Sequence, residues 1–400
     1  MNGETSREIS QPEQTNPNPS RRVPSKSKVA YVLHGLTLGG VEVALVSAVP
    51  RLCREFDLRI FCLGPIDPTL ISHLSPDEKM AFVSFPSQPI KYAFAIISAI
   101  RYLLRFNPDL LVCSLWRASL AGVVVKKLRK RVRLLSFVHS TNFFHIPDRL
   151  FTTLALANAD GILTDSKAVS DFVLRSFRPK VPIQRVSFFI QPTPPQRTNA
   201  PLNSGKGIRF IYLGRLDPVK NIPLAIDTIQ YLRSEGIEAS LDIFGRMNSY
   251  WDDIAAHIEM RNLEPFVQFK GELSPAAKVG IFKNYNFLIQ MSRAEGMAMS
   301  VAEAMQNGVV CVVTPVGEIP NYSEDMKTAI FMNPPPSQNW QSSLKKIQRV
   351  CSSPELYETL SKNCWANFAN VGTYADSLVD YLNSANFESN FDECQNKSSF

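Results

Sequence analysis

Long apolar runs are missing from this sequence. No stretch reaches the roughly 18 consecutive apolar residues that a helix needs to cross a bilayer. The N-terminal stretch MNGETSREISQPEQTNPNPSRR is polar and lacks the apolar segment of a secretory signal peptide. Both absences argue against a membrane-spanning or secreted protein, and we expect a cytoplasmic one.

Cysteine spacings typical of metal sites are also absent. The seven cysteines are scattered along the chain, and none stands in CxxC or CxxxH spacing. Buried free thiols are the expected state, because isolated cysteines behave as small apolar residues. Neither disulfide bonds nor a metal site is expected, and no feature indicates a cofactor.

Charge is moderate in amount and uneven in distribution. The formal net charge is +7, and much of it lies in the stretch KKLRKRVR. One interpretation is a solvated helix end; the other is a patch that docks on anionic lipid, where each basic residue contributes ~1 kcal/mol. Nucleic acid binding is not expected, because no recognition module accompanies the patch. The patch residues are Lys126, Lys127, Arg129, Lys130, Arg131 and Arg133.

Strand and helix patterns alternate along most of the 400 residues, a length that favours two domains. Apolar runs such as KVAYVLHG are typical of strands covered on both faces, and VEVALVSAVPRLCREF has helical spacing. This repetition predicts parallel sheets. It stops in a Pro- and Asn-rich segment and then restarts. We therefore expect two doubly wound α/β domains, at residues 28–195 and 208–370, with a linker at 196–207.

Three terminal segments lie outside these domains. Residues 1–27 and 386–400 are polar, and we expect disordered tails there. Between residues 371 and 385, YADSLVDYLNS has a helical pattern that no longer alternates with strands. We expect this helix to pack back on the N-terminal domain.

The turn after the first strand of each domain has features that suit a phosphate, since ligands of such sheets bind at the carboxyl ends of the strands. In HGLTLGGVEVAL, Gly39 and Gly40 expose a helix N-terminus; the alternative is a tight turn with a positive φ. In YLGRLDPVKN, Arg215 and Lys220 flank a helix start and can balance a diphosphate. The alternative there is an Arg215–Asp217 ion pair and a solvated Lys220.

The stretch SRAEGMAMSVAEAMQNG places two glutamates in one loop-helix segment. Glu303 follows Ser300 with the S-x-x-E spacing of a capping box, which predicts that Ser300 caps the helix. Glu295 lies before the cap, next to Gly296, where the backbone can come close to a ligand. Carboxylates accept hydrogen bonds from hydroxyl groups. Two carboxylates around the N–H groups of residues 297 to 300 would suit a nucleotide sugar.

These motifs resemble those of a known family. Glu295 and Glu303, placed after GRLDPVKN, resemble the E-x7-E and G-R-x-x-x-x-K patterns of the GT4 retaining glycosyltransferases, over roughly residues 28 to 375. VQFKGELSP and VVTPVGEIP resemble the nucleotide-side loops of that family, and Gly39 and Gly40 with Glu42 resemble its first loop. The resemblance implies the GT-B fold, in which an acceptor-side domain and a nucleotide-sugar domain face each other across a cleft.

The resemblance also implies a role for each matching residue. His139, in FVHS, resembles the histidine beside the reacting sugar, and Glu295 would contact the donor hexose; these two are the implied catalytic residues. Arg215 and Lys220 would hold the diphosphate, and Glu303 the ribose. Backbone groups complete the implied donor site, at Gly39, Gly40, Gly296, Met297, Ala298 and Met299. The implied reaction retains anomeric configuration without a metal ion, and the D-x-D motif of GT-A enzymes is absent.

The expected function is transfer of a hexose or N-acetylhexosamine from a nucleotide-diphosphate sugar to a glycan or lipid-linked hydroxyl, in polysaccharide, lipopolysaccharide or glycolipid synthesis. The basic patch and the apolar helix around Phe94 to Leu104 favour peripheral contact with the cytoplasmic face of a membrane. The alternatives are a nucleotide-sugar epimerase of similar fold and a non-catalytic subunit. Ala298, FGRMNS and FFIQPTPP depart from the family pattern and leave the donor sugar open.

Overall fold

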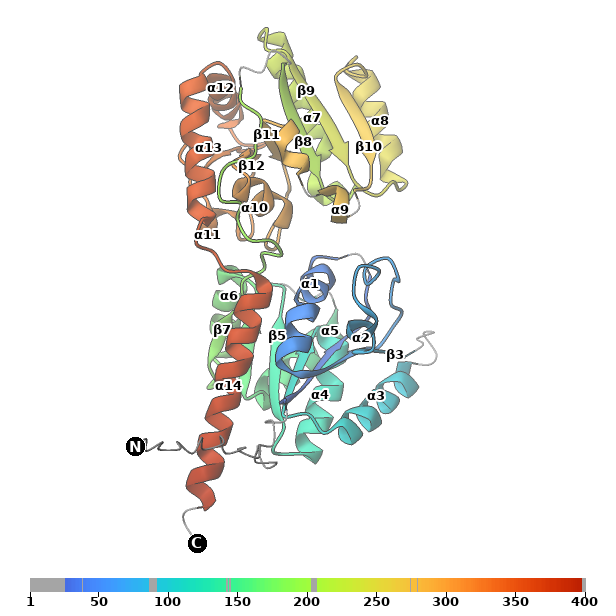
Figure 1. Ribbon diagram of the computed structural model, residues 1–400. Helices are drawn as coiled ribbons and strands as arrows, with labels where there is room; N and C mark the ends of the chain where they lie inside the picture. The colour runs from blue at the N-terminus through green and yellow to red at the C-terminus, as the bar shows by residue number, and fades with distance from the viewer. Residues whose placement is uncertain are drawn as a thin grey trace, which may run out of the picture.

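The computed structural model describes residues 26–37, 39–85, 92–141, 143, 145–202, 207–273, 275–278 and 280–397. The chain forms two α/β domains, one above the other in Figure 1, each built on a parallel sheet flanked by helices. The prediction of two doubly wound domains is therefore confirmed. Of the predicted N-terminal tail, only Lys26 and Ser27 lie within the described residues.

The N-terminal sheet has the strand order β3-β2-β1-β4-β5-β6-β7. Its central strands are apolar and buried on both faces, as expected for strands between two helical layers. The strands are β1 (Lys28–Leu33), β2 (Asp57–Cys62), β3 (Phe82–Ser84), β4 (Leu110–Ser114), β5 (Arg133–Val138), β6 (Gly161–Thr164) and β7 (Ile183–Arg185). The helices are α1 (Gly40–Glu55), α2 (Pro76–Lys79), α3 (Tyr92–Phe106), α4 (Trp116–Leu128), α5 (Ile146–Asn158) and α6 (Lys167–Phe177).

The C-terminal sheet has the order β10-β9-β8-β11-β12-β13. Its strands are β8 (Ile208–Leu213), β9 (Ala239–Phe244), β10 (Val267–Gly271), β11 (Phe287–Gln290), β12 (Val310–Val313) and β13 (Ala329–Phe331). The helices are η2 (Pro218–Lys220), α7 (Ile222–Ser234), α8 (Tyr250–Met260), α9 (Pro275–Lys278), η3 (Ile281–Asn284), α10 (Met299–Gln306), α11 (Ile319–Tyr322), α12 (Trp340–Cys351) and α13 (Pro354–Phe368). In both sheets the strand order reverses beside the first strand of the domain. Open α/β sheets bind their ligands at such a reversal, so the functional site is expected there.

The last helix, α14 (Tyr374–Lys397), runs from the junction of the domains down the side of the N-terminal domain in Figure 1. Tyr374, Leu378 and Leu382 are buried in the same core cluster as β1 and α1. The helix includes residues 386–397, the range for which the composition predicts a disordered tail. Extending an anchored helix is easier than starting one, so a polar extension can stay helical.

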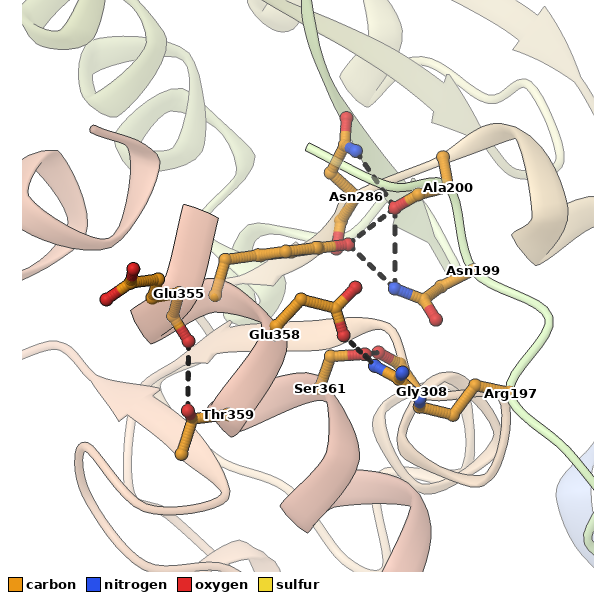
Figure 2. A network of polar contacts seen from close by, with 10 residues as sticks. Arg197, Asn199, Ala200, Asn286, Gly308, Glu355, Glu358, Thr359 and Ser361 are labelled. Atoms are coloured by element: carbon orange, nitrogen blue, oxygen red, sulfur yellow. Dashed lines mark hydrogen bonds and ion pairs between the residues drawn. The ribbon is translucent and has the colours of Figure 1, made fainter. Parts of the chain in front are cut away.

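The predicted linker is attached to the C-terminal domain over part of its length. The backbone N–H groups of Thr198 and Asn199 donate to the Asn307 carbonyl, at 3.0 and 3.2 Å. The Ala200 carbonyl accepts from Asn286 Nδ2 at 3.1 Å (Figure 2) and from the hydroxyl of Tyr357 at 2.8 Å. This segment therefore belongs structurally to the C-terminal domain; residues 203–206 of the predicted linker lie outside the described residues.

The cysteines and the helices of the fold can be compared with the expectations from composition. The six cysteines whose side chains are described are free thiols, and all except the half-buried Cys53 are buried, as predicted. Within the described part of the chain, none of the helices combines the length and apolar character needed to cross a membrane.

Candidate active site

Glu295 and Lys220 form a buried ion pair at the carboxyl edge of the C-terminal sheet. Lys220 Nζ lies 2.7 and 2.8 Å from the two carboxylate oxygens of Glu295. Gln290 Nε2 and the Ser292 hydroxyl each donate to Glu295 Oε1 at 2.5 Å. The side chains of Glu295 and Lys220 are 6% and 15% exposed, so this network fixes both charged groups. Lys220 is therefore not the solvated side chain of the alternative interpretation.

Arg215 lies in the turn between β8 and η2. Its side chain is exposed, and it forms no ion pair with any residue that the structure describes. The expected alternative partner, Asp217, instead accepts the N–H of Val219 at 2.9 Å and starts η2. The Tyr212 hydroxyl donates to the Arg215 carbonyl at 2.7 Å and holds the turn. The guanidinium is therefore available to an anion.

Residues 295–299 form a loop, called the 295–299 loop below, that leads into α10. No backbone N–H from residue 296 to residue 300 donates a hydrogen bond to another residue of the described part. Ala298 is left-handed, with φ +54°, at the position where the resemblance favours glycine or proline. These N–H groups lie at the positive end of the α10 dipole, which suits an anion or a hydroxyl oxygen.

Glu303 does not belong to a capping box, and that prediction is wrong. The helix begins at Met299, its N-cap is Ala298, and no side chain caps it. Ser300 instead donates to Gln290 Oε1 at 2.8 Å, because the buried Gln290 amide needs an acceptor and a donor partner. The Glu303 carboxylate forms an ion pair with Lys278, which the sequence patterns do not single out.

The first turn of the N-terminal domain contains Gly39 and Gly40 at the start of α1. Gly39 has φ −142°, so the alternative of a tight turn with positive φ does not apply. A Cβ on Gly39 would lie 2.3 Å from the Glu42 carboxylate, which is tucked under the turn. Burial raises the pKa of Glu42, and it lowers the pKa of His34, whose Nε2 is 3.7 Å away.

His139 follows β5 and is held at both ring nitrogens. Its Nε2 is 2.8 Å from the Ser114 hydroxyl, and its Nδ1 is 3.2 Å from Asp165 Oδ2. The three residues follow or end neighbouring strands β4, β5 and β6, so parallel pairing brings them together. Ser114 and Asp165 are functional candidates that the motifs do not reveal, although each stands at a strand end.

The structure thus brings the predicted residues into two groups, one in each domain. Lys220 and Glu295 touch directly, whereas His139 belongs to a separate network in the N-terminal domain. The domains meet through the 295–299 loop, because Met297 and Met299 pack against the core cluster that contains Phe188. A Cβ on Gly40 would lie 4.0 Å from Met299, so the first turn of the N-terminal domain faces the 295–299 loop. No group of three or more possible metal-ligating residues occurs within the described ranges.

The basic patch lies away from these groups, at the C-terminal end of α4. Lys126 pairs with Asp160 at 2.7 Å, and Arg133 donates to the Ala385 carbonyl, so these two residues have structural partners. The other four patch residues are exposed: Lys127, Arg129, Lys130 and Arg131. On the neighbouring helix α3, Phe94 is 71% exposed, and Ile97 and Tyr102 are also exposed. The surface therefore combines basic and apolar groups.

Comparisons with known proteins agree with the fold. The model of the family described as Glycosyltransferase Family 4 matches residues 38–192, and that described as Glycosyl transferases group 1 matches residues 196–364. No curated protein matches the chain in sequence. The structure is similar to Anabaena HepE bound to UDP, with 16% identity, a TM-score of 0.73 and coverage of 89% of this chain and 100% of that one.

Two further solved structures have the same architecture. Sucrose-phosphate synthase from Thermosynechococcus elongatus has 15% identity and a TM-score of 0.70, covering 90% of this chain and 99% of that one. The lipopolysaccharide outer core galactosyltransferase WaaB has 17% identity and a TM-score of 0.67, with coverage of 90% and 99%. Since the two family models together account for most of its length, this chain belongs to the group 1 (GT4-type) glycosyltransferases and has the GT-B fold.

Proposed function

We propose that the protein transfers a hexose or N-acetylhexosamine from a nucleotide-diphosphate sugar to a hydroxyl of a glycan or lipid-linked acceptor, with retention of configuration. The observation that carries the proposal is the buried Lys220–Glu295 pair beside the unpaired Arg215. The proposed setting is polysaccharide, lipopolysaccharide or glycolipid synthesis.

The charges suit a departing diphosphate. Arg215 and Lys220 supply two cations, and the free N–H groups at the start of α10 add the positive end of a helix dipole. Such fixed groups stabilise charge that develops as the sugar leaves. We propose that the reaction needs no metal ion, because Arg215, Lys220 and these N–H groups can all interact with the diphosphate.

The carboxylates suit the sugars of the donor. Glu295 is held rigidly by Lys220, Gln290 and Ser292, so it can orient a hexose hydroxyl without losing its own geometry. Glu303 is assigned to the ribose, and Lys278 must then move or share that carboxylate. His139, behind the first loop, is assigned to the side of the anomeric carbon. Ser114 and Asp165 hydrogen-bond to the two ring nitrogens of His139. The proposed role of His139 is therefore to shape and polarise the side of the site that faces the anomeric carbon.

We propose uridine as the base of the donor nucleotide. HepE has been crystallised with UDP and with UDP-glucose, and a TarM variant with UDP, which supports a UDP-sugar here. A thermal-shift screen of UDP-, GDP- and ADP-sugars decides this, because a ligand at about 100 times its Kd adds ~2.7 kcal/mol of stability. One class should raise the Tm. No response to any sugar nucleotide would remove the proposal.

Assays on the same purified protein distinguish the proposed transferase from an epimerase and from a non-catalytic subunit. An epimerase would release nucleotide or isomerise the sugar without an acceptor, whereas a transferase releases nucleotide in proportion to added acceptor. A non-catalytic subunit would show the thermal shift without nucleotide release.

The exposed surface of α3 and α4 is assigned to the face of an anionic membrane. From Lys79 to Asp148 the only intervening acidic residue is Asp109, so basic side chains dominate this region. Exposed Phe94, Ile97 and Tyr102 can enter the lipid interface while the basic residues contact headgroups.

Vesicle flotation tests the membrane assignment. Replacing three exposed patch residues by alanine should remove ~3 kcal/mol of binding to vesicles with anionic lipid, at ~1 kcal/mol for each residue; the three are Lys127, Arg129 and Lys130. The control removes the same charge from exposed positions of the C-terminal domain, at Lys345, Arg349 and Lys362. Equal binding by both variants would overturn the assignment.

A further inference from the structure

A buried carboxylate of the C-terminal domain reaches into the N-terminal domain. Glu318, at the start of α11, is 5% exposed. Its Oε1 accepts the backbone N–H of Lys167 at 2.7 Å, and its Oε2 accepts that of Ala168 at 2.7 Å. Asn321 Nδ2 donates to Oε2 at 2.9 Å and fixes the side chain. The contact joins residues that are far apart in sequence.

The two N–H groups belong to the first turn of α6, which begins at Lys167. N–H groups at this position have no acceptor within their own helix, and they lie at the positive end of the dipole. The next N–H, of Val169, is taken by the Ser166 hydroxyl at 3.3 Å. Glu318 therefore supplies the acceptors that α6 lacks, and it can do so only when the two domains are in contact.

The same residue is fixed to the 295–299 loop through its backbone. The N–H of Glu318 donates to the Gly296 carbonyl at 2.9 Å. The preceding Gly317 has φ +62°, and a Cβ there would lie 2.3 Å from the Glu295 carbonyl oxygen. Residues 317 and 318 thus press against the backbone of Glu295 and Gly296. A displacement of Glu318 would displace the loop.

On the other side, α6 leads directly to the His139 network. Asp165 lies two residues before Lys167, is 8% exposed, and holds His139 Nδ1. A continuous path of hydrogen bonds and adjacent backbone therefore runs from the 295–299 loop through Glu318 and the start of α6 to His139. In this path the step from one domain to the other is made by Glu318.

We propose that Glu318 is a positioning residue that sets the 295–299 loop in register with His139 when the domains close. The carboxylate of Glu318 already accepts the backbone N–H groups of Lys167 and Ala168. Glu318 therefore acts on the reaction through the elements that it holds in place. This positioning role rests on the proposed function, because the alignment of the 295–299 loop with His139 matters only for sugar transfer. The contact of Glu318 with α6 can be tested without any substrate.

The first arm of the experiment is amide hydrogen exchange of the full-length protein, comparing wild type with Glu318→Gln and Glu318→Ala. We expect faster exchange at Lys167 and Ala168 in both variants, because an amide side chain cannot accept both N–H groups. The matched control is Glu324→Gln, an exposed glutamate of the same domain that pairs with Lys327. Unchanged exchange at the start of α6 in the Glu318 variants would overturn the proposal.

The second arm is steady-state kinetics on the same proteins. We expect kcat to fall roughly 10- to 100-fold, as misplacement of catalytic groups by about 1 Å can cause, with donor KM changed much less. A fold defect would instead lower the Tm and the fraction of active enzyme, so the Tm of each variant is measured beside its kcat; Glu318→Gln keeps the shape of the side chain and guards against that outcome. Faster exchange with unchanged kcat would also overturn the positioning role.

The two arms separate the proposals. Wild-type protein that transfers no sugar from any nucleotide donor would contradict the proposed function, and the exchange arm would then decide alone whether Glu318 joins the domains. Active wild type with an inactive, folded Glu318→Gln variant supports both.

Discussion

The turn after β1 and the turn after β8 occupy equivalent places in the two sheets but differ in charge. From His34 to Val43 the first turn has no lysine or arginine, and it encloses the buried Glu42. The second turn presents Arg215 and holds Lys220 against Glu295. The same strand-turn-helix unit therefore occurs with two different charge patterns, and charge rather than backbone is the reason for proposing that the C-terminal domain receives the diphosphate.

The acidic first turn suits a neutral, hydroxyl-rich partner, and the cationic second turn suits phosphate. This difference depends on burial, because a carboxylate under Gly39 repels a second anion and cannot turn toward solvent. Four substitutions test the comparison, from the largest expected effect to the smallest.

Replacing Glu295 by alanine should have the largest effect. Lys220 would lose its carboxylate, and the sugar would lose its fixed acceptor, so we expect kcat to fall about 10²- to 10³-fold. Steady-state kinetics measures this. Glu295→Gln keeps the shape of the side chain and serves as the folding control. Full activity of the alanine variant would remove the role assigned to Glu295.

Arg215→Ala should weaken donor binding with little change in stability. The side chain is exposed, so the free energy of unfolding should change by no more than about 0.5 kcal/mol. Loss of a charge-assisted hydrogen bond should raise the donor Kd roughly 10- to 100-fold. Calorimetry with the nucleotide sugar measures the Kd, and Arg185→Ala, at an exposed position of β7, is the control. Identical Kd values for the two variants would contradict the charge comparison.

Asp165→Asn tests the N-terminal group. The amide would no longer fix the His139 tautomer as a carboxylate does, and we expect kcat to fall about 10-fold, less than the 100-fold that a 1 Å misplacement can cause. The donor Kd should not change, because the proposed diphosphate site lies in the other domain. Asp171→Asn, an exposed aspartate paired with Lys167, provides the comparison. A change in donor Kd alone would place His139 on the wrong side of the site.

Glu42→Gln should give the smallest effect, on stability and its pH dependence. Burial raises the pKa of Glu42 above its ordinary value of 4.5. The wild type therefore loses stability from this group as pH rises above 4.5 through the raised pKa, whereas glutamine does not. We expect the variant to gain on wild type by roughly 2 °C in Tm toward neutral pH. Thermal unfolding between pH 4.5 and 7.5 measures this, and a gain that is equal at all pH values would refute the cause.

The fold could be predicted from sequence because its signals are local. Alternating apolar runs and helical spacing identify parallel α/β domains without knowledge of distant contacts. The motif residues Arg215, Lys220 and Glu295 follow β8 and β11, and their place in the segments after these strands could likewise be predicted from local patterns. The continuation of α14 past residue 385 has no such local signal, because composition does not show that the preceding helix is anchored.

Parts of the site depend on contacts that no local pattern encodes. The pairing of Glu303 with Lys278 and of Glu318 with the start of α6 follows from how separate elements and domains meet. The capping box failed for a related reason. The buried amide of Gln290 competes for the Ser300 hydroxyl, and the S-x-x-E spacing alone cannot reveal that competitor.

The packing of α14 on α1 means that the N-terminal domain is discontinuous in sequence. Its core includes Tyr374 and Leu378, which the ribosome adds only after the entire second domain. A nascent chain therefore exposes an uncovered apolar face on α1 until the second domain and α14 have been synthesised. Of these two domains, the one that is made first is completed after the other.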